Sequence, residues 1–564
     1  MIFENILFFI NTRAPRLLDW IFRWPLARRG MSRYVFRKAG TSTAPRPHPY
    51  SMACPYTTWR SLTDRRYTGR HLGECADDPA LPPLPQVADL FLRKEQTLSV
   101  RSSMLFAAFA QWFTDSFLRT EHGIIFGPDG NPEIDATRNF RRRPDRHRFN
   151  TSNHEIDLCQ IYGLGEEQTS LLRTLGEGGR KGCLKSQDIK GEEYPAYLLT
   201  APSPALQPLQ INDEFKGLHD EPLIRAVFGQ AATQPARHGA MFAVGLEHGN
   251  STLGNSLMNT IFLREHNRVA GMIAAESPGG DDERVFQTAR NTMIVVLLKI
   301  VISDYIRHIT PYNIPLELIP GLADTQRWYR SNRISMEFNL LYRWHQLIPD
   351  KPGFLTNLGE YRNNNPLLIQ HGVRQLVREL SLEPAGRIGL QNTAVDLQPV
   401  EMDTLNLMRA SRLAPYNEYR KRFGLEPAKD FEELTGDPGL AKLLHQVYGG
   451  EIDRLEWYVG IFAERHANDG IMGNLLTRMV AWDAFTQALT NPLLANGIFN
   501  ETTFSKAGWQ IIAETSSLED VLARQWGKGP LVCSFNVKRA KEQLAGLPPQ
   551  APPVEATGDP AGAA

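Results

Sequence analysis

The chain has 564 residues, and its 62 Lys and Arg residues balance its 62 Asp and Glu residues. Equal numbers of positive and negative charges give no electrostatic reason to expect nucleic acid as a partner. The few Cys residues are scattered without paired metal-type spacing, which argues against a disulfide-built secreted module and favours a reducing compartment: Cys54, Cys75, Cys159, Cys183 and Cys533.

Residues 1–45 form a separate, locally basic segment. Residues 1–10 (MIFENILFFI) are apolar but far shorter than the roughly 20 residues that cross a bilayer. No small-residue cleavage site follows, so we expect no signal peptide. Trp and Phe then alternate with Arg in short stretches broken by Pro, a pattern typical of an amphipathic helix lying in one leaflet of a membrane. The same pattern also fits a pair of N-terminal helices that packs on the domain.

The rest of the chain divides into three predicted parts. Residues 46–90 are rich in Pro, Ser, Thr and Arg and predict an extended connector. From 91 to 545 the apolar spacing is mostly helical, and residues 285–309 predict a long, largely buried helix. Strands with alternating polarity are scarce, so the predicted fold class is mainly α. Residues 546–564 have too little apolar bulk to pack and predict a disordered tail.

The most informative stretch is residues 336–350, MEFNLLYRWHQLIPD. Tyr342 precedes His345 by three positions, so on a helix the phenol and the imidazole would lie on neighbouring positions of one face. The imidazole could then hold an iron while the phenol exchanges an electron with it. A bare Y-x-x-H pair usually consists of two side chains that only pack in the protein core. The longer string therefore decides between a haem site and ordinary core packing.

That string resembles the proximal haem helix of the animal cyclooxygenases (prostaglandin endoperoxide synthases), members of the animal haem peroxidase superfamily. Further segments resemble the same family in the same order: 109–120 (FAQWFTDSFLRT), 154–163 (HEIDLCQIYG), 262–269 (FLREHNRV), 415–424 (PYNEYRKRFG) and 451–458 (EIDRLEWY). The resemblance implies one large helical haem-peroxidase-like domain over 91–545 that binds haem b. The growth-factor-like module of the animal cyclooxygenases has no counterpart in this sequence.

The resemblance also implies partners and a location. The expected substrates are a polyunsaturated fatty acid and O2, and a homodimer is compatible with the family. Because cyclooxygenases carry amphipathic anchoring helices in the place of residues 1–45, we expect a monotopic membrane-associated protein on the cytoplasmic face.

Individual residues acquire roles from the same resemblance. Tyr342 corresponds to the tyrosine that carries the catalytic radical, and His345 corresponds to the axial haem ligand. Tyr305 lies where the family has a tyrosine hydrogen-bonded to the radical site. Tyr458 matches the tyrosine that orients the axial ligand through water.

The substrate channel matches the family less closely. Tyr312 corresponds to the channel-mouth tyrosine that pairs with an arginine to bind the fatty-acid carboxylate. Arg37 and Lys38 lie close to that arginine but not in exact register, and either could equally be a solvated charge. The channel serine of the family falls at Ala484 without a gap and at Thr486 with a short gap. The channel wall has therefore changed.

The distal segment contains the most consequential departure. The family has Gln and, four residues later, His. In this sequence Gln111 is kept and Asp115 takes the place of the His. The distal group must move a proton between the two oxygens of a peroxide, and an ordinary carboxylate is ionised and a poor acid unless burial raises its pKa. Peroxidase activity is therefore in doubt.

Three functional hypotheses follow. The first is a haem-dependent fatty-acid dioxygenase in which Tyr342 abstracts hydrogen. The string YRWH, in place of the animal YHWH, also resembles fungal linoleate dioxygenases and, more loosely, plant alpha-dioxygenases. The product could therefore be a hydroperoxide or an endoperoxide. The second is a haem peroxidase or peroxygenase that uses Asp115 as its acid-base group. The third is a haem-binding membrane protein that has lost its chemistry.

Overall fold

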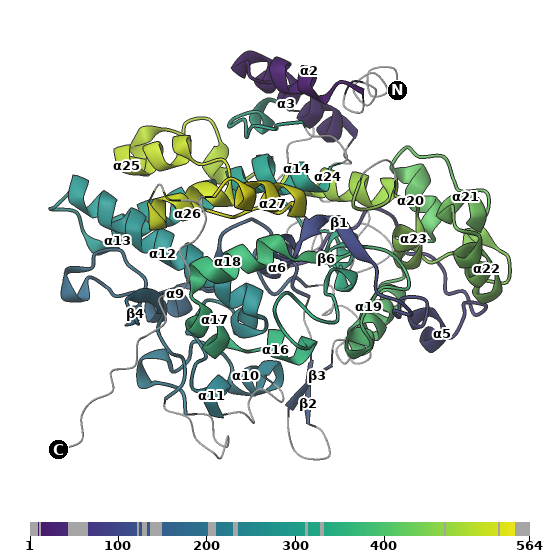
Figure 1. Ribbon diagram of the computed structural model, residues 1–564, viewed down its shortest axis with the longest axis horizontal. Helices are drawn as coiled ribbons and strands as arrows, with labels where there is room; N and C mark the ends of the chain where they lie inside the picture. Colours follow the sequence, from purple (N-terminus) through teal and green to yellow (C-terminus); the bar gives the residue numbers. More distant parts are fainter. Residues whose placement is uncertain are drawn as a thin grey trace, which may run out of the picture.

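The structure is a computed structural model, and it describes residues 10, 13–42, 66–120, 123–126, 132–135, 149–200, 210–228, 235–310, 314–326, 332–466, 470–527, 529 and 531–547. Helices predominate, which confirms the mainly α prediction (Figure 1). The strands described pair into three two-stranded antiparallel sheets: β1 (Leu98–Ser103) with β6 (Pro384–Gly386), β2 (Gly123–Phe126) with β3 (Pro132–Asp135), and β4 (Ser186–Ile189) with β5 (Glu192–Pro195).

Three packed helices form the centre of the domain: α6 (Met104–Asp115), α12 (Leu253–Glu276) and α13 (Asp282–Ile300). Helix α12 packs against both α6 and α13, and most of its side chains are buried. Each of the three begins at a side-chain cap that accepts a backbone N–H, supplied by Ser103, Thr252 and Asp281.

Helix α13 continues through a π-helical turn, η5 (Val301–Tyr305), into α14 (Ile306–Ile309). This confirms the predicted long buried helix. Residues Asp282–Ile309 are long and apolar enough to cross a membrane, but 72% of their most apolar window is buried inside the protein, so they form a core helix. The π-helical turn brings Tyr305, which has no exposed surface, to the centre of the domain.

Helix α5 lies within the segment predicted to be an extended connector. The remaining α-helices, α5 among them, surround this centre. They are α5 (Leu84–Ala88), α8 (Cys159–Tyr162), α9 (Glu166–Leu172), α10 (Glu221–Phe228), α11 (Pro235–His238), α15 (Met336–Leu341), α16 (Leu358–Tyr361), α17 (Asn365–His371), α18 (Val373–Leu382), α19 (Gln398–Ala410), α20 (Tyr416–Arg422), α21 (Phe431–Thr435), α22 (Pro438–Val447), α23 (Trp457–Ala463), α24 (Asn474–Leu489), α25 (Glu501–Glu514), α26 (Leu518–Trp526) and α27 (Val537–Ala545).

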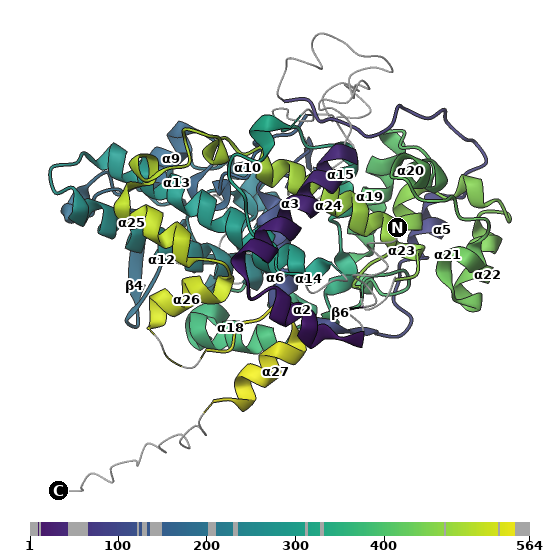
Figure 2. The same ribbon diagram turned by 90° about the horizontal axis from the view of Figure 1, so that it is seen from above.

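Two N-terminal helices, α2 (Pro15–Ile21) and α3 (Pro25–Ser42), lie on one face of the molecule, where α3 packs against α24 (Figures 1 and 2). The Phe36 ring packs edge-on against Phe485 of α24 at 5.0 Å between centroids. Buried Ser32 accepts the backbone N–H of Glu317 at 2.9 Å. The N-terminal segment is therefore docked on the rest of the protein along one face of α3.

Candidate active site

The segment that carries Tyr342 and His345 is not one continuous helix, so that part of the sequence prediction is wrong. Helix α15 ends at Leu341, and Tyr342 is its C-cap residue. Trp344 has φ −89° and ψ 59°, outside the helical region, and its N–H donates to the Tyr342 carbonyl at 2.9 Å. His345 then begins a 3₁₀ turn, η7 (His345–Leu347). A tight turn, rather than a helical face, keeps the phenol and the imidazole close together in the chain.

The ring of Tyr342 is buried among other aromatic rings. The ring is 8% exposed and contacts Phe338 at 5.1 Å and Trp344 at 4.7 Å between centroids. Burial raises the pKa of both Tyr342 and Tyr305, and the Tyr342 phenol raises that of Tyr305 further. The Tyr305 phenol in turn opposes the rise in the pKa of Tyr342, so the two phenols are neighbours, although among the described residues neither hydroxyl has a partner in regular hydrogen-bond geometry. Both phenols stay neutral near pH 7.

On the proximal side, His345 faces a carboxyl group that the sequence analysis did not single out. His345 Nδ1 lies 3.0 Å from Oε1 of Glu401, which belongs to α19 and has no exposed side-chain surface. The hydroxyl of Tyr458 donates to Glu401 Oε2 at 3.2 Å and to the Arg343 carbonyl at 3.0 Å. Tyr458 therefore reaches the imidazole by way of Glu401.

A sequence signal for Glu401 did exist. Its positions i+3, i+4 and i+7 are Thr404, Leu405 and Met408, and all of them are buried in α19. Glu401 thus occupies the core-facing stripe of an amphipathic helix, where a charged residue is rare unless it is paired.

On the distal side, α6 directs Gln111 and Asp115 to one face, four residues apart. Thr252 Oγ1 donates to Gln111 Oε1 at 3.3 Å, and Asn255 Nδ2 donates to Asp115 Oδ2 at 3.0 Å. Burial raises the pKa of Asp115, while His248 and the Asn255 hydrogen bond oppose that rise. A larger fraction of Asp115 is therefore protonated near neutral pH than of an exposed aspartate, so Asp115 is the better proton donor.

His248 is a second distal residue that the sequence analysis missed. It lies on the 3₁₀ helix η4 (Glu247–Asn250), and its Nδ1 is 3.0 Å from Glu247 Oε1, which also pairs with Arg119. Asn255 Nδ2 donates to the His248 carbonyl at 3.3 Å as well as to Asp115. Asp115 thus belongs to a polar cluster with a histidine, although the histidine of the family's distal helix is absent.

Aromatic rings join the proximal and distal sides of the site. Phe106 of α6 stacks on Tyr305 at 5.4 Å and on Trp344 at 6.2 Å between centroids. Burial lowers the pKa of Arg343, and the carboxyl groups that act on this guanidinium include Glu401 on the proximal side and Asp115 on the distal side. The two sides are therefore neighbours in one site.

The residues present fit a haem group. A histidine whose Nδ1 lies against a carboxyl group has its Nε2 left for a metal. Among the described residues, buried polar atoms without a hydrogen-bond partner gather in this segment, including Tyr342 OH, Arg343 Nε and Trp344 Nε1. Gln111 and Asp115 supply polar groups from the opposite helix. Such an assembly matches a haem with one axial imidazole.

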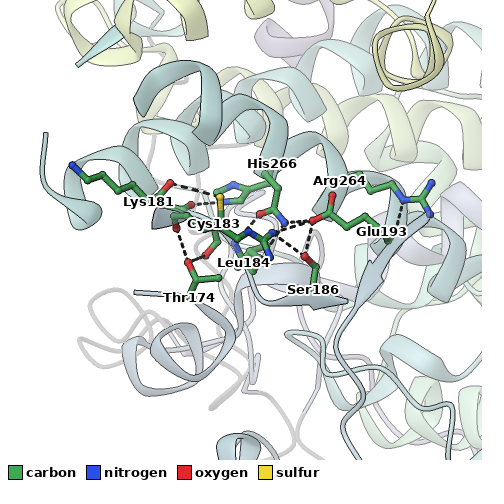
Figure 3. A network of polar contacts seen from close by, with 11 residues as sticks. Thr174, Lys181, Cys183, Leu184, Ser186, Glu193, Arg264 and His266 are labelled. Atoms are coloured by element: carbon green, nitrogen blue, oxygen red, sulfur yellow. Dashed lines mark hydrogen bonds and ion pairs between the residues drawn. The ribbon is translucent and has the colours of Figure 1, made fainter. Parts of the chain in front are cut away.

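The string 262–269 has a structural role (Figure 3). His266 receives a hydrogen bond from the Tyr162 hydroxyl at 2.8 Å, and its Nε2 bonds the Gly182 carbonyl at 2.9 Å. Burial lowers the pKa of His266 to about 4, so the ring is neutral. Arg264 pairs with Glu192 of β5 at 2.9 Å. These bonds fasten the β4–β5 hairpin and its preceding loop to α12, so neither residue is available for catalysis.

The predicted channel residues are placed less completely. Tyr312 lies outside the described residues, and Arg37 and Lys38 are exposed on α3. Ala484 and Thr486 are both buried on α24, and the Thr486 hydroxyl donates to the Trp482 carbonyl at 2.7 Å. The structure thus leaves both alignments of the channel serine open.

The chain belongs to the animal haem peroxidase family, whose model matches residues 52–530. It is similar to prostaglandin G/H synthase 1 of Mus musculus, with 33% identity over 512 residues that cover 87% of this chain and 76% of that protein. It is also similar to prostaglandin G/H synthase 2 of Oryctolagus cuniculus, with 31% identity over 530 residues that cover 91% of this chain and 79% of that protein.

Solved structures share the fold, and two examples follow. The fatty acid alpha-dioxygenase of Oryza sativa, a variant with palmitic acid, matches with a TM-score of 0.67 at 18% identity and covers 95% of this chain and 97% of that one. Peroxidase A of Dictyostelium discoideum matches with a TM-score of 0.60 at 18% identity and covers 84% and 96%. These matches confirm the haem-peroxidase-like fold.

Proposed function

We propose that the protein is a haem-dependent oxidoreductase that adds O2 to a polyunsaturated fatty acid by means of a radical on Tyr342. The observation that carries this proposal is the burial of the Tyr342 phenol beside the Tyr305 phenol, three positions from the candidate axial ligand His345. A phenol so placed is shielded from water, which would otherwise quench a radical. The similarity to prostaglandin G/H synthases and to a fatty acid alpha-dioxygenase supports the same reaction class.

Haem b, bound through His345, would supply the one-electron oxidation of the phenol. Tyr342 then loses one electron and its hydroxyl proton and becomes a phenoxyl radical. This radical takes a hydrogen atom from an activated C–H bond of the acyl chain, which restores the phenol. O2 adds to the carbon radical, and the resulting peroxyl radical takes the hydrogen atom back from Tyr342, so that RH and O2 give ROOH.

Oxygen uptake tests the proposal directly. Haem-loaded protein is given linoleate, arachidonate or palmitate, oxygen consumption is followed, and the products are identified by mass spectrometry. We expect the two polyunsaturated acids to be oxygenated faster than palmitate. Exclusive use of palmitate would instead indicate oxygenation next to the carboxylate, and no uptake with any of the three would contradict the proposal.

The second candidate function is a peroxidase or peroxygenase, and the environment of Asp115 favours it. Burial raises the pKa of this carboxyl group, and Asn255 holds one of its oxygens. A raised pKa keeps the acid protonated to higher pH, so peroxide turnover that needs this proton is present at low pH and is lost as the pH rises through the pKa of Asp115.

The substitution Asp115→His distinguishes the two functions. If the aspartate is a weak distal acid, the wild type turns over hydrogen peroxide slowly, and Asp115→His raises that rate by about two to four orders of magnitude, the usual value of a general acid-base group. Oxygenation that depends on Tyr342 stays substantially intact. A wild type that is a fast peroxidase and is crippled by Asp115→Ala would make the second function the better one.

We also propose that α2 and α3 lie in a membrane surface. One face of α3 docks on α24, whereas Trp20, Trp24 and Leu26 are 59%, 61% and 84% exposed. Exposed Trp beside Arg is typical of an interfacial anchor. The pairing of Tyr312 with Arg37 or Lys38, the cytoplasmic face and the homodimer stay predictions.

Deleting residues 1–30 is expected to shift the protein from the membrane pellet to the soluble fraction, because the exposed apolar face is removed. The milder pair Trp20→Ser and Trp24→Ser, which leaves the α3–α24 contact in place, should reduce binding to liposomes in the same direction. A full-length protein that is soluble without detergent and does not bind liposomes would contradict the anchor.

A further inference from the structure

Glu401 is a buried carboxyl group surrounded by hydrogen-bond donors. Thr393 Oγ1 donates to its Oε1 at 2.9 Å, Gln346 Nε2 to the same oxygen at 3.3 Å, and the Tyr458 hydroxyl to Oε2 at 3.2 Å. His345 Nδ1 lies 3.0 Å from Oε1. Because Thr393, Gln346 and Tyr458 all present donors, the group acts as an acceptor, which is the role of a carboxylate.

Burying a carboxylate is costly unless its charge is paired and its oxygens are hydrogen-bonded. Thr393 and Tyr458 come from chain segments on either side of α19, so the tertiary fold brings separate segments together around Glu401. His345 Nδ1 meets no acceptor with ordinary hydrogen-bond angles in the part of the chain that the structure describes. The Nδ1 atom is nevertheless within hydrogen-bond distance of Oε1.

We infer that Glu401 is a positioning residue for the haem ligand: it accepts the Nδ1–H of His345, fixes the plane of the imidazole and leaves Nε2 for the iron. This inference rests on the proposed role of His345 in haem binding. A carboxylate behind a metal-bound imidazole makes the ring a stronger donor, and such partners set metal affinity as well as orientation. Its negative charge also favours the more oxidised iron, which lowers the reduction potential.

The test uses the haem-loaded protein and two properties other than activity. These are the iron–histidine stretching band of the ferrous form, measured by resonance Raman, and the ferric/ferrous midpoint potential. Glu401→Gln keeps the size of the side chain and removes the charge. We expect the stretching band to move to lower wavenumber, the potential to rise and haem affinity to fall by about 10–100-fold.

A matched control separates this effect from the loss of any buried carboxylate. Glu337 has no exposed surface and accepts hydrogen bonds from the Tyr419 hydroxyl at 2.8 Å and the His71 backbone N–H at 3.0 Å, in contacts that do not involve His345. Glu337→Gln should leave the stretching band and the potential unchanged.

Thr393→Val supplies a second variant that does not depend on the folding of Glu401→Gln. Removal of one donor from Oε1 concentrates negative charge on the oxygen that faces His345, so the band should move to higher wavenumber and the potential should fall. Opposite shifts for Glu401→Gln and Thr393→Val support the inference. An unchanged band and potential in both variants would overturn it. Absence of an iron–histidine band from the wild type would instead show that His345 is not the ligand, which is a failure of the proposed function.

Discussion

Tyr342→Phe is expected to leave haem bound and to reduce fatty-acid oxygen uptake to background. The substitution removes only the hydroxyl, which is buried beside the Tyr305 phenol, so little packing is lost. Without that hydroxyl, no phenoxyl radical can form at position 342. Oxygen consumption with linoleate measures the loss, and the haem absorption band measures cofactor retention.

A matched control for this prediction is Tyr194→Phe. Tyr194 is also buried, at 1% exposure, but it belongs to the β4–β5 hairpin and donates to Glu192 at 3.1 Å. It should keep nearly full oxygen uptake. Freeze-quenched samples should show a tyrosyl radical signal in the wild type and in Tyr194→Phe that is missing from Tyr342→Phe. Undiminished uptake by Tyr342→Phe would defeat the radical mechanism and favour the peroxygenase function.

His345→Ala is expected to abolish stable haem binding, because it removes the imidazole proposed as the axial ligand. Glu401 then keeps its other donors, Thr393, Gln346 and Tyr458, so the fold should survive the substitution. Haem titration of the purified apoprotein, followed by absorption, measures the effect.

The comparison for this variant is His371→Ala. His371 stacks on Phe354 at 4.4 Å and faces Glu379, away from the proposed haem ligand in both sequence and contacts. It should bind haem as the wild type does. A full-strength haem band in His345→Ala would show that the ligand has been misassigned.

The helical fold could be predicted from the sequence because it depends on local patterns. The apolar run of residues 285–309 predicted the core helix Asp282–Ile309. The π-helical turn that places Tyr305 was not predicted. The end of α15 at Leu341 was missed for a related reason. Helical spacing continues through YRWH, and only the backbone turn at Trp344 shows that the helix has stopped.

The candidate site was predicted in part. The resemblance located Tyr342, His345, Gln111 and Asp115, but not the groups that surround them. Glu401 and His248 lie far along the chain from the residues they act on, and the packing of α19 and η4 alone brings them close. Contacts between distant segments depend on tertiary packing, which a single sequence does not display.

Oxygen-isotope labelling tests the central claim most directly. Haem-loaded protein is given linoleate under ¹⁸O₂ with unlabelled peroxide present as initiator, and the product is analysed by mass spectrometry. A Tyr342-dependent dioxygenase places both atoms of one ¹⁸O₂ molecule in the same hydroperoxide, and Tyr342→Phe yields none of it. A product with a single unlabelled oxygen from the peroxide, formed equally by Tyr342→Phe, would contradict the account.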